Sequence, residues 1–242
     1  MQVIDKLRDD YEYYRGVGKN YLSNSDIGAL LTNPKAFRQQ RDDNKNFAEG
    51  RLFHQLLLEP DKVHKVVSVD VSTRNTKEYK TFCSENNLDF ALLTKEVEEI
   101  HNLVGVIKAN IAFYDDIYAE GNVYEEPSIG NIKGVEWKGK ADIITSDFII
   151  DLKTTSDINK FKWSAKAYHY DSQCYVYQQL FGKPLAFLVI DKVTAQLGVF
   201  EPTVEFIQSG ERKVAKAIEM YRKYFGENPK DDISNYFIHE TL

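Results

Sequence analysis

The segment from residue 139 to residue 155 places charged residues inside two short apolar runs that are joined by a turn at 145–147. Both runs have the length and composition of β-strands. Charge inside a buried strand is costly unless it is paired or bound to a metal ion. Because side chains alternate along a strand, Asp151 and Lys153 should share one face, and Asp142 should lie near it if the strands pair around the turn. The sequence therefore predicts two carboxylates and one ammonium group at one place.

This set of groups suits metal-assisted hydrolysis of a phosphodiester. Carboxylate oxygens are hard ligands of the kind that Mg²⁺ prefers, and a nearby lysine can orient an attacking water or help to deprotonate it. The pattern alone fits a second interpretation equally well, in which the charged residues lie on the solvent-exposed edge of a hairpin and have no catalytic role.

A second segment, residues 47–60, is predicted to be a helix that ends at Pro60. Gly50 lies one turn before His54, so no side chain covers the imidazole on that side. That gap suits a metal ion or a DNA backbone, although a lone histidine in an apolar helix is more often a packing residue. Glu59, at the helix end, is interpreted as a partner in a local salt bridge.

A third segment, predicted to be a helix from about Ser156 to the residue before Gly182, carries Gln173 and Tyr177 four positions apart on one face. Its neighbours Tyr175 and Val176 are interpreted as core residues. Near the start of the chain, a serine-rich cap that includes Ser23 precedes an apolar helix.

Three motifs in this order, Gly-x-x-x-His with Leu-Glu-Pro, Asp-x8-Asp-x-Lys and Gln-x-x-x-Tyr, resemble the PD-(D/E)XK nuclease superfamily. The resemblance covers most of residues 20–200 and is closest to the phage-type exonuclease VIII nuclease domain, which is related to the RecB-type and lambda exonucleases. It implies a mixed α/β fold with a central mixed sheet flanked by helices. It also implies catalytic roles for His54, Asp142, Asp151 and Lys153, with a metal held by His54, Asp142, Asp151 and the main-chain carbonyl of Leu152.

The resemblance further implies DNA contacts by Gln173, Tyr177, Ser23, Arg51 and Lys140. At position 140 this branch often has arginine, and lysine keeps the charge but loses the planar fork of donors. The departure puts the specific DNA contact at this position in question and leaves the metal site intact.

The activity that the resemblance implies is Mg²⁺-dependent 5′→3′ digestion of linear duplex DNA, with Mn²⁺ able to substitute. The product is a 3′ single strand for an annealing protein, and the enzyme is expected to be a trimeric or tetrameric ring. Two alternatives stay open: a structure-specific endonuclease on the same fold, and a non-catalytic DNA-binding or scaffold protein. The intact His, Asp and Asp-x-Lys set argues against the second.

Composition fits one nuclease domain over residues 1–242, with 43% hydrophobic and 28% charged residues. No apolar run reaches a membrane-spanning length of about 18 residues, and the start lacks a signal-peptide pattern, so we expect a cytoplasmic protein. Two cysteines cannot hold a four-cysteine iron–sulfur cluster, and no Walker A loop is present.

The net charge of −6 at first disfavours a nucleic-acid partner. The stretch from residue 133 to residue 166, however, contains seven lysines and five acidic residues, and two of these acids are the predicted metal ligands. The site region is therefore locally positive. An exposed, solvated helix face remains the simpler explanation for some of the lysines at 160, 162 and 166.

Periodicity and breaking residues predict the element order. Helices are expected at 24–32, 34–42, 47–58, 75–86, 95–114, 156–182 and 203–225, and strands at 65–71, 121–127, 133–144, 147–153, 185–190 and 198–201. Residues 1–18 are expected to form a helix or arm, and residues 227–242 a polar tail that docks on a neighbour.

Overall fold

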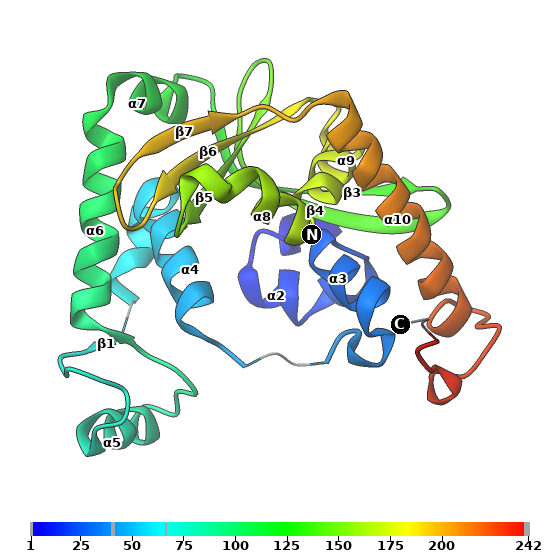
Figure 1. The fold of residues 1–242 in the computed structure, drawn as a ribbon, viewed down its shortest axis with the longest axis horizontal. Coiled ribbons are helices and arrows are strands. Elements are labelled where there is room, and N and C mark those ends of the chain that lie inside the picture. Colours follow the sequence, from blue (N-terminus) through cyan, green and yellow to red (C-terminus); the bar gives the residue numbers. More distant parts are fainter. Residues whose placement is uncertain (1, 40–41, 66, 240–242) are drawn as a thin grey trace.

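The central feature of the fold is a five-stranded sheet in the order β3-β4-β5-β6-β7 (Figure 1). The computed structural model describes residues 2–39, 42–65 and 67–239. Strands β5 and β6 are parallel, and the other neighbouring pairs are antiparallel. The strands are β3 (Val123–Ile132), β4 (Val135–Ile144), β5 (Ile149–Thr155), β6 (Leu185–Asp191) and β7 (Leu197–Phe200). The predicted mixed α/β class is confirmed.

Two turns set the register of the strands that matter most. Lys133 and Gly134 form a two-residue hairpin turn between β3 and β4, with φ of +52° and +78°. Paired positive φ values of this kind match the twist of the flanking strands. Between β4 and β5, Thr145 N donates to Phe148 O at 2.9 Å, so the predicted turn at 145–147 is confirmed.

Helices cover both faces of the sheet. On one face lie α3 (Asn24–Thr32), α9 (Tyr170–Phe181) and α10 (Val204–Tyr224), around a core that includes Trp137 and Phe187. On the other lie α4 (Lys45–Leu58), α6 (Thr94–Ala109) and α7 (Ile111–Tyr118), around a second core. Strand β5 is covered on both sides, which explains its apolar sequence and the cost of placing charge in it.

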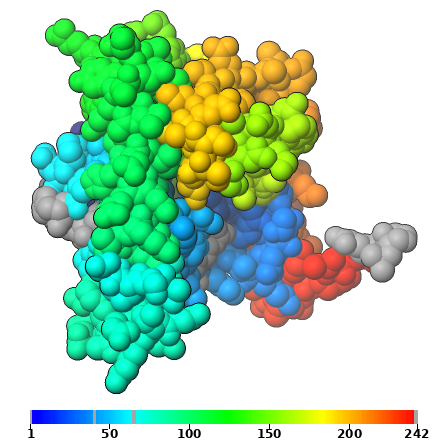
Figure 2. Space-filling model, turned by 60° about the vertical axis from the view of Figure 1, so that its left-hand side comes forward, coloured from blue at the N-terminus to red at the C-terminus, as the bar shows by residue number. Residues whose placement is uncertain are grey.

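A small subdomain lies at the N-terminal end of α6 (Figure 1). It holds the parallel pair β1 (Ser68–Val69) and β2 (Leu92–Leu93) with α5 (Lys77–Glu85), around its own cluster of buried residues. In the space-filling view α6 forms a ridge, and this segment projects at one end of it (Figure 2).

The first residues pack against the sheet, as the prediction of a helix or arm allows. Helices α1 (Val3–Lys6) and α2 (Asp10–Tyr14) and the 3₁₀ helix η1 (Val17–Asn20) occupy this segment. Arg8 forms an ion pair with Glu126 of β3 at 2.6 Å. At the other end, η5 (Ile233–Asn235) packs near α10, where the rings of Tyr224 and Tyr236 meet with centroids 6.1 Å apart.

Three predicted helices were wrong in extent, and single residues break two of them. The helix expected at 95–114 divides at Asn110, whose side chain accepts from Phe113 N and begins α7. The helix expected at 156–182 divides into η4 (Ile158–Lys160), α8 (Phe161–Ala167) and α9, and His169 at φ +61° separates α8 from α9. The helix expected at 34–42 is only the 3₁₀ turn η2 (Pro34–Ala36), and residues 40–41 lie outside the described part.

Two strand predictions also differ from the structure. The strand expected at 65–71 is paired only at Ser68–Val69 and follows the 3₁₀ helix η3 (Pro60–Lys65); residue 66 lies outside the described residues. Strand β3 extends five residues past the predicted end at 127, because the hairpin turn lies at 133–134. Within the described ranges, no helix combines the length and the apolar character needed to cross a lipid bilayer.

Candidate active site

The site begins where β4 and β5 separate. The two strands pair only at Ile143 with Ile150 and at Ile144 with Ile149. Beyond that point the backbone N–H of Leu152 donates to Oδ2 of Asp142 at 2.7 Å. A side chain thus replaces the missing ladder bond, which fixes the carboxylate and leaves the two strands apart.

His54 reaches this place from α4. Its Nδ1 lies 3.5 Å from Oδ1 of Asp142, and its Nε2 lies 3.1 Å from the carbonyl oxygen of Leu152. A Cβ built at Gly50, one turn earlier, would meet no atom within 4 Å. The space beside Gly50 is therefore open, and its use by a metal ion or a DNA backbone stays a prediction.

Glu125 completes the cluster, and the sequence interpretation missed it. Its Oε1 lies 3.8 Å from Nδ1 of His54. Ligand atoms of Glu125, His54 and Asp142 all lie within 4.8 Å of one another. Glu125 lies between two residues of β3 that pair with Ile143 and Ala141, the neighbours of Asp142 on β4. Its φ of +49° is uncommon for a residue with a side chain. The turn at 133–134 is the signal that would have aligned these two acids.

Asp151 and Lys153 share one face of β5, as predicted, and their side chains form an ion pair. The Nε2 amide of Gln173, on α9, donates to Oδ1 of Asp151. The ammonium of Lys153 also lies 4.8 Å from the ring centroid of Tyr170. Asp151 is only 1% exposed, so its charge depends on these partners.

The acids differ in their protonation because their partners differ. Burial raises the pKa of Asp142, but His54, Lys153 and the Leu152 amide lower it more, so it stays below its usual range. Burial and the charge of Asp142 raise the pKa of Glu125, against the effect of His54. Burial is therefore the main cause of the raised pKa of Glu125, and repulsion by Asp142 adds to it.

On β5 and α4 the same forces act on the other groups. Burial raises the pKa of Asp151 to about 6, although Lys153 opposes this. Burial lowers the pKa of Lys153, but Asp151 raises it more, so the ammonium stays charged. Burial lowers the pKa of His54, while Asp142 and Glu125 raise it to about 10.

This donor set fits a divalent cation. Two carboxylates and one imidazole lie within 4.8 Å of one another, and the carbonyl of Leu152 contacts the same imidazole. Carboxylate and carbonyl oxygens are the ligands that Mg²⁺ and Mn²⁺ prefer. A cation would also remove the repulsion between Glu125 and Asp142.

Comparison with known proteins places the fold. A family model described as "PDDEXK-like domain of unknown function (DUF3799)" matches residues 29–230. The chain belongs to this PDDEXK-like family. No curated protein matches it.

Two solved structures are similar to this chain to different degrees. A candidate exonuclease from Eubacterium rectale has a TM-score of 0.64 at 16% identity, over 97% of this chain and 95% of that one. A phage-related exonuclease from Haemophilus somnus is 16% identical, with a TM-score of 0.34, over 67% of this chain and 92% of that one. The first of these shows a shared fold over nearly the whole length of both chains.

Three of the predicted DNA contacts line one hollow beside the PDDEXK-like site. Gln173, Tyr177 and Ser23 border a cavity of about 570 Å³. Gln173 also holds Asp151, and the Tyr177 hydroxyl donates to the Lys140 carbonyl at 2.8 Å. The side chains of Ser23, Gln173 and Tyr177 are mostly buried. Contact of these three residues with DNA stays a prediction. Tyr175 and Val176 lie in the core, as interpreted.

The two predicted cationic contacts already have acidic partners. Lys140 lies 2.7 Å from Asp10 of α2, and Arg51 pairs with Asp43. DNA phosphates would have to replace these carboxylates, so these two contacts also stay predictions. Glu59 forms an ion pair with Lys62 at 2.6 Å, which confirms its interpretation as a local salt bridge.

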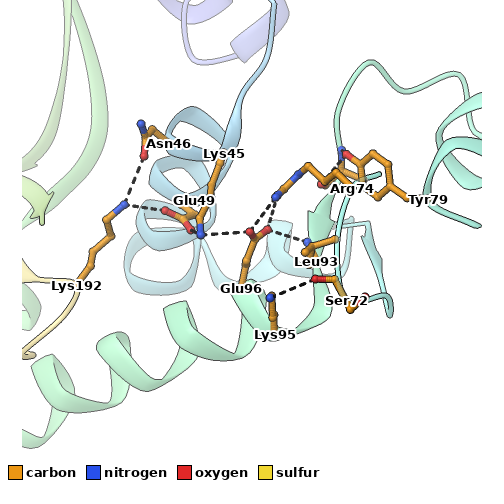
Figure 3. Close-up of polar contacts among 11 residues, drawn as sticks. Lys45, Asn46, Glu49, Ser72, Arg74, Tyr79, Leu93, Lys95, Glu96 and Lys192 are labelled. Atoms are coloured by element: carbon orange, nitrogen blue, oxygen red, sulfur yellow. Dashed lines mark hydrogen bonds and ion pairs between the residues drawn. The ribbon is translucent and has the colours of Figure 1, made fainter. Parts of the chain in front are cut away.

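A buried ionic network holds α4, the helix that carries His54. Figure 3 shows Lys45 between Glu49 of α4 and Glu96 of α6, at 3.3 and 3.2 Å. Lys192, after β6, reaches Glu49 at 2.8 Å, and Arg74 pairs with Glu96. Both glutamates are buried, so the network ties α4 to α6 and to the β6–β7 connection.

Proposed function

We propose that this chain is a divalent-metal-dependent DNA exonuclease that digests linear duplex DNA in the 5′→3′ direction and leaves a 3′ single strand. The observation that supports this most is the cluster of His54, Glu125 and Asp142 within 4.8 Å, beside the Asp151–Lys153 pair. A hydrolytic site of this composition acts on phosphodiesters more readily than on uncharged substrates, because it gathers cations and an ammonium group.

His54, Glu125, Asp142, Asp151 and the Leu152 carbonyl would hold Mg²⁺ or Mn²⁺. Such an ion, when bound, lowers the pKa of its water and stabilises the negative charge that develops on phosphate. Lys153 stays charged beside Asp151, so its role is to orient the attacking water or a phosphate oxygen by donating hydrogen bonds. Gln173 holds the Asp151 carboxylate in place from α9.

Preference for DNA ends follows from the charge of the chain. A protein of net charge −6 has little open basic surface for holding a duplex from one side. Enclosure of an end by a ring of three or four copies would keep the substrate bound through many cuts. Such a ring, a single-strand annealing partner and action in the cytoplasm belong to this proposal.

The test is digestion of linear duplex DNA labelled at the 5′ or 3′ end, beside nicked and closed circles of the same sequence. We expect Mg²⁺-dependent loss of the linear DNA, early release of the 5′ label and resistant circles. Asp142→Asn is the control for contaminating nuclease. Early release of the 3′ label would overturn the polarity, and cleavage of closed circles would favour an endonuclease on the same fold.

The subunit count has a separate test. Size-exclusion chromatography with light scattering should give three or four times the 28.0 kDa chain mass. A monomer that still degrades only linear DNA would reject the ring and leave the exonuclease assignment in place.

A further inference from the structure

The short helix α8 follows the site strand β5 in the chain, after the 3₁₀ helix η4 (Figure 1). Its outer side carries exposed aromatic and basic side chains. Phe161 and Ala165 bury its inner side in the core. Trp163 and Tyr168, by contrast, are 61% and 67% exposed. The segment that contains α8 reaches the surface in the space-filling view, in yellow-green (Figure 2). Two large rings are therefore kept in water within six residues, which packing of the fold does not explain.

The charge of this face is opposite to that of the whole protein. Residues 161–168 contain Lys162 and Lys166 and no acidic residue, in a chain of net charge −6. Within the described ranges, neither lysine forms an ion pair, whereas nearby Lys160 pairs with Asp157 at 3.0 Å. The ammonium of Lys162 lies 4.3 Å from the ring centroid of Trp163. Two uncompensated cations thus flank an exposed aromatic ring.

The face leads directly to the site. The ring centroid of Tyr168 lies 6.1 Å from that of Tyr170, and the Tyr170 ring lies 4.8 Å from the ammonium of Lys153. One aromatic ring therefore separates the exposed Tyr168 from the lysine of the Asp151–Lys153 pair. Tyr168 lies at the C-cap of α8, and the Lys162–Trp163 pair lies in its first turn.

We propose that α8 binds single-stranded DNA, with Trp163 and Tyr168 stacking on bases and Lys162 and Lys166 contacting phosphates. The assignment of this strand as the one left by digestion rests on the proposed exonuclease function. Exposed rings with lysines between them suit a single strand, because every base has a face for stacking and the backbone is a regular anion. In a duplex the base faces are covered by their neighbours, so the rings would find nothing to stack on.

Tryptophan fluorescence tests the proposal without cleavage. The chain has two tryptophans, and Trp137 is fully buried, so a change caused by an added oligonucleotide reports on Trp163. The full-length protein is titrated with a thymidine 20-mer in EDTA. We expect saturable quenching by the single strand and much weaker quenching by a blunt duplex of equal length.

Affinities measured by the anisotropy of a labelled 20-mer then test the residues. Trp163→Ala and Tyr168→Ala should each weaken single-strand binding about tenfold, within the range of one stacked base. Lys162→Ala with Lys166→Ala should lower the slope of log affinity against log salt by about 1.4, at about 0.7 for each lost phosphate contact. Tyr114→Ala, at an exposed tyrosine on α7, is the matched control and should bind normally.

The outcomes separate this proposal from the proposed function. Single-strand binding that depends on Trp163, in a protein that degrades no DNA, would support the α8 site and overturn the exonuclease. If Trp163→Ala and Tyr168→Ala both digest DNA normally and bind the single strand with unchanged affinity, the α8 site is overturned and the exonuclease is not. Equal quenching by the duplex would overturn the single-strand site in favour of duplex binding. A Trp163 signal that changes with protein concentration in the absence of DNA would overturn it in favour of self-association.

Discussion

The carboxylate of Asp142 accepts the backbone N–H of Leu152 at 2.7 Å, at the point where β4 and β5 part. The same contact places the Leu152 carbonyl 3.1 Å from Nε2 of His54. Asp142 therefore has two roles: Oδ2 fixes the backbone of β5, and Oδ1 lies 3.5 Å from the imidazole of His54. Separate variants can distinguish these two roles.

Asp142→Asn should abolish Mg²⁺-dependent cleavage and retain the fold. The amide oxygen can still accept from Leu152 N, but the negative charge that would hold the cation is gone. Asp142→Ala also removes the acceptor, so it should lower the free energy of unfolding by a further amount of about 1–3 kcal/mol. Digestion assays measure the loss of cleavage, and urea unfolding of both variants measures the loss of stability. Normal cleavage by the Asn variant would remove Asp142 from the metal site.

Glu125→Gln should lower the affinity for Mn²⁺ by about 10- to 100-fold, the range seen when a group at a metal site is changed. The reason is its place among the ligand atoms of His54 and Asp142, which lie within 4.8 Å of one another. Calorimetric titration with Mn²⁺ measures it. Glu126→Gln is the matched control, because the neighbouring acid pairs with Arg8 instead. Equal affinities in both variants would show that Glu125 is not a ligand.

The local part of this site was predictable from the sequence, and the reason is strand geometry. Alternation placed Asp151 and Lys153 on one face, and the structure shows them as an ion pair. The short turn at 145–147 brought Asp142 beside them. Gly50 marked the open side of the helix at His54. That His54 lies beside Asp142, far away in the sequence, was expected only from the resemblance.

The remaining features depend on tertiary structure. Glu125 enters the site through a positive φ, which sequence propensity disfavours and only the surrounding fold can impose. The contact of Gln173 with Asp151 requires the exact angle at which α9 crosses the sheet. The break between α8 and α9 at His169 could not be predicted either, because no glycine or proline lies there.

Lys153→Met should reduce the cleavage rate at least about a hundredfold, the lower range for removing one donor aimed at developing negative charge. Metal affinity should change less, because an ammonium is not a ligand. Lys153→Arg keeps the charge but changes its geometry and should recover only part of the rate. Digestion rates and Mn²⁺ titration of the same preparations separate the two effects. Loss of Mn²⁺ binding as complete as in Asp151→Asn would assign Lys153 to ion binding instead.

Glu96→Gln tests the network that holds α4, through the dependence of stability on pH. Burial raises the pKa of Glu96, but Arg74, the Leu93 amide and Lys45 lower it more, so the folded pKa lies below the unfolded one. A depressed carboxyl pKa stabilises the fold above the unfolded value, which is about 4.3, and this contribution is lost as pH falls through the folded value.

At pH 7 the variant should therefore lose about 1.5–3 kcal/mol in the free energy of unfolding, the range for hydrogen bonds to charged groups. The loss is no larger because Lys45 and Arg74 are partly exposed and stay solvated. The difference from the wild type should shrink as the pH falls below about 4, because the wild-type Glu96 is then neutral as well. Urea unfolding at pH 7 and at pH 3.5 measures both values. Glu99→Gln, on the exposed side of α6, is the control and should stay within about 0.5 kcal/mol of the wild type. A Glu96→Gln deficit that is equal at both pH values would show that shape, and not charge, connects α6 to the helix that carries His54.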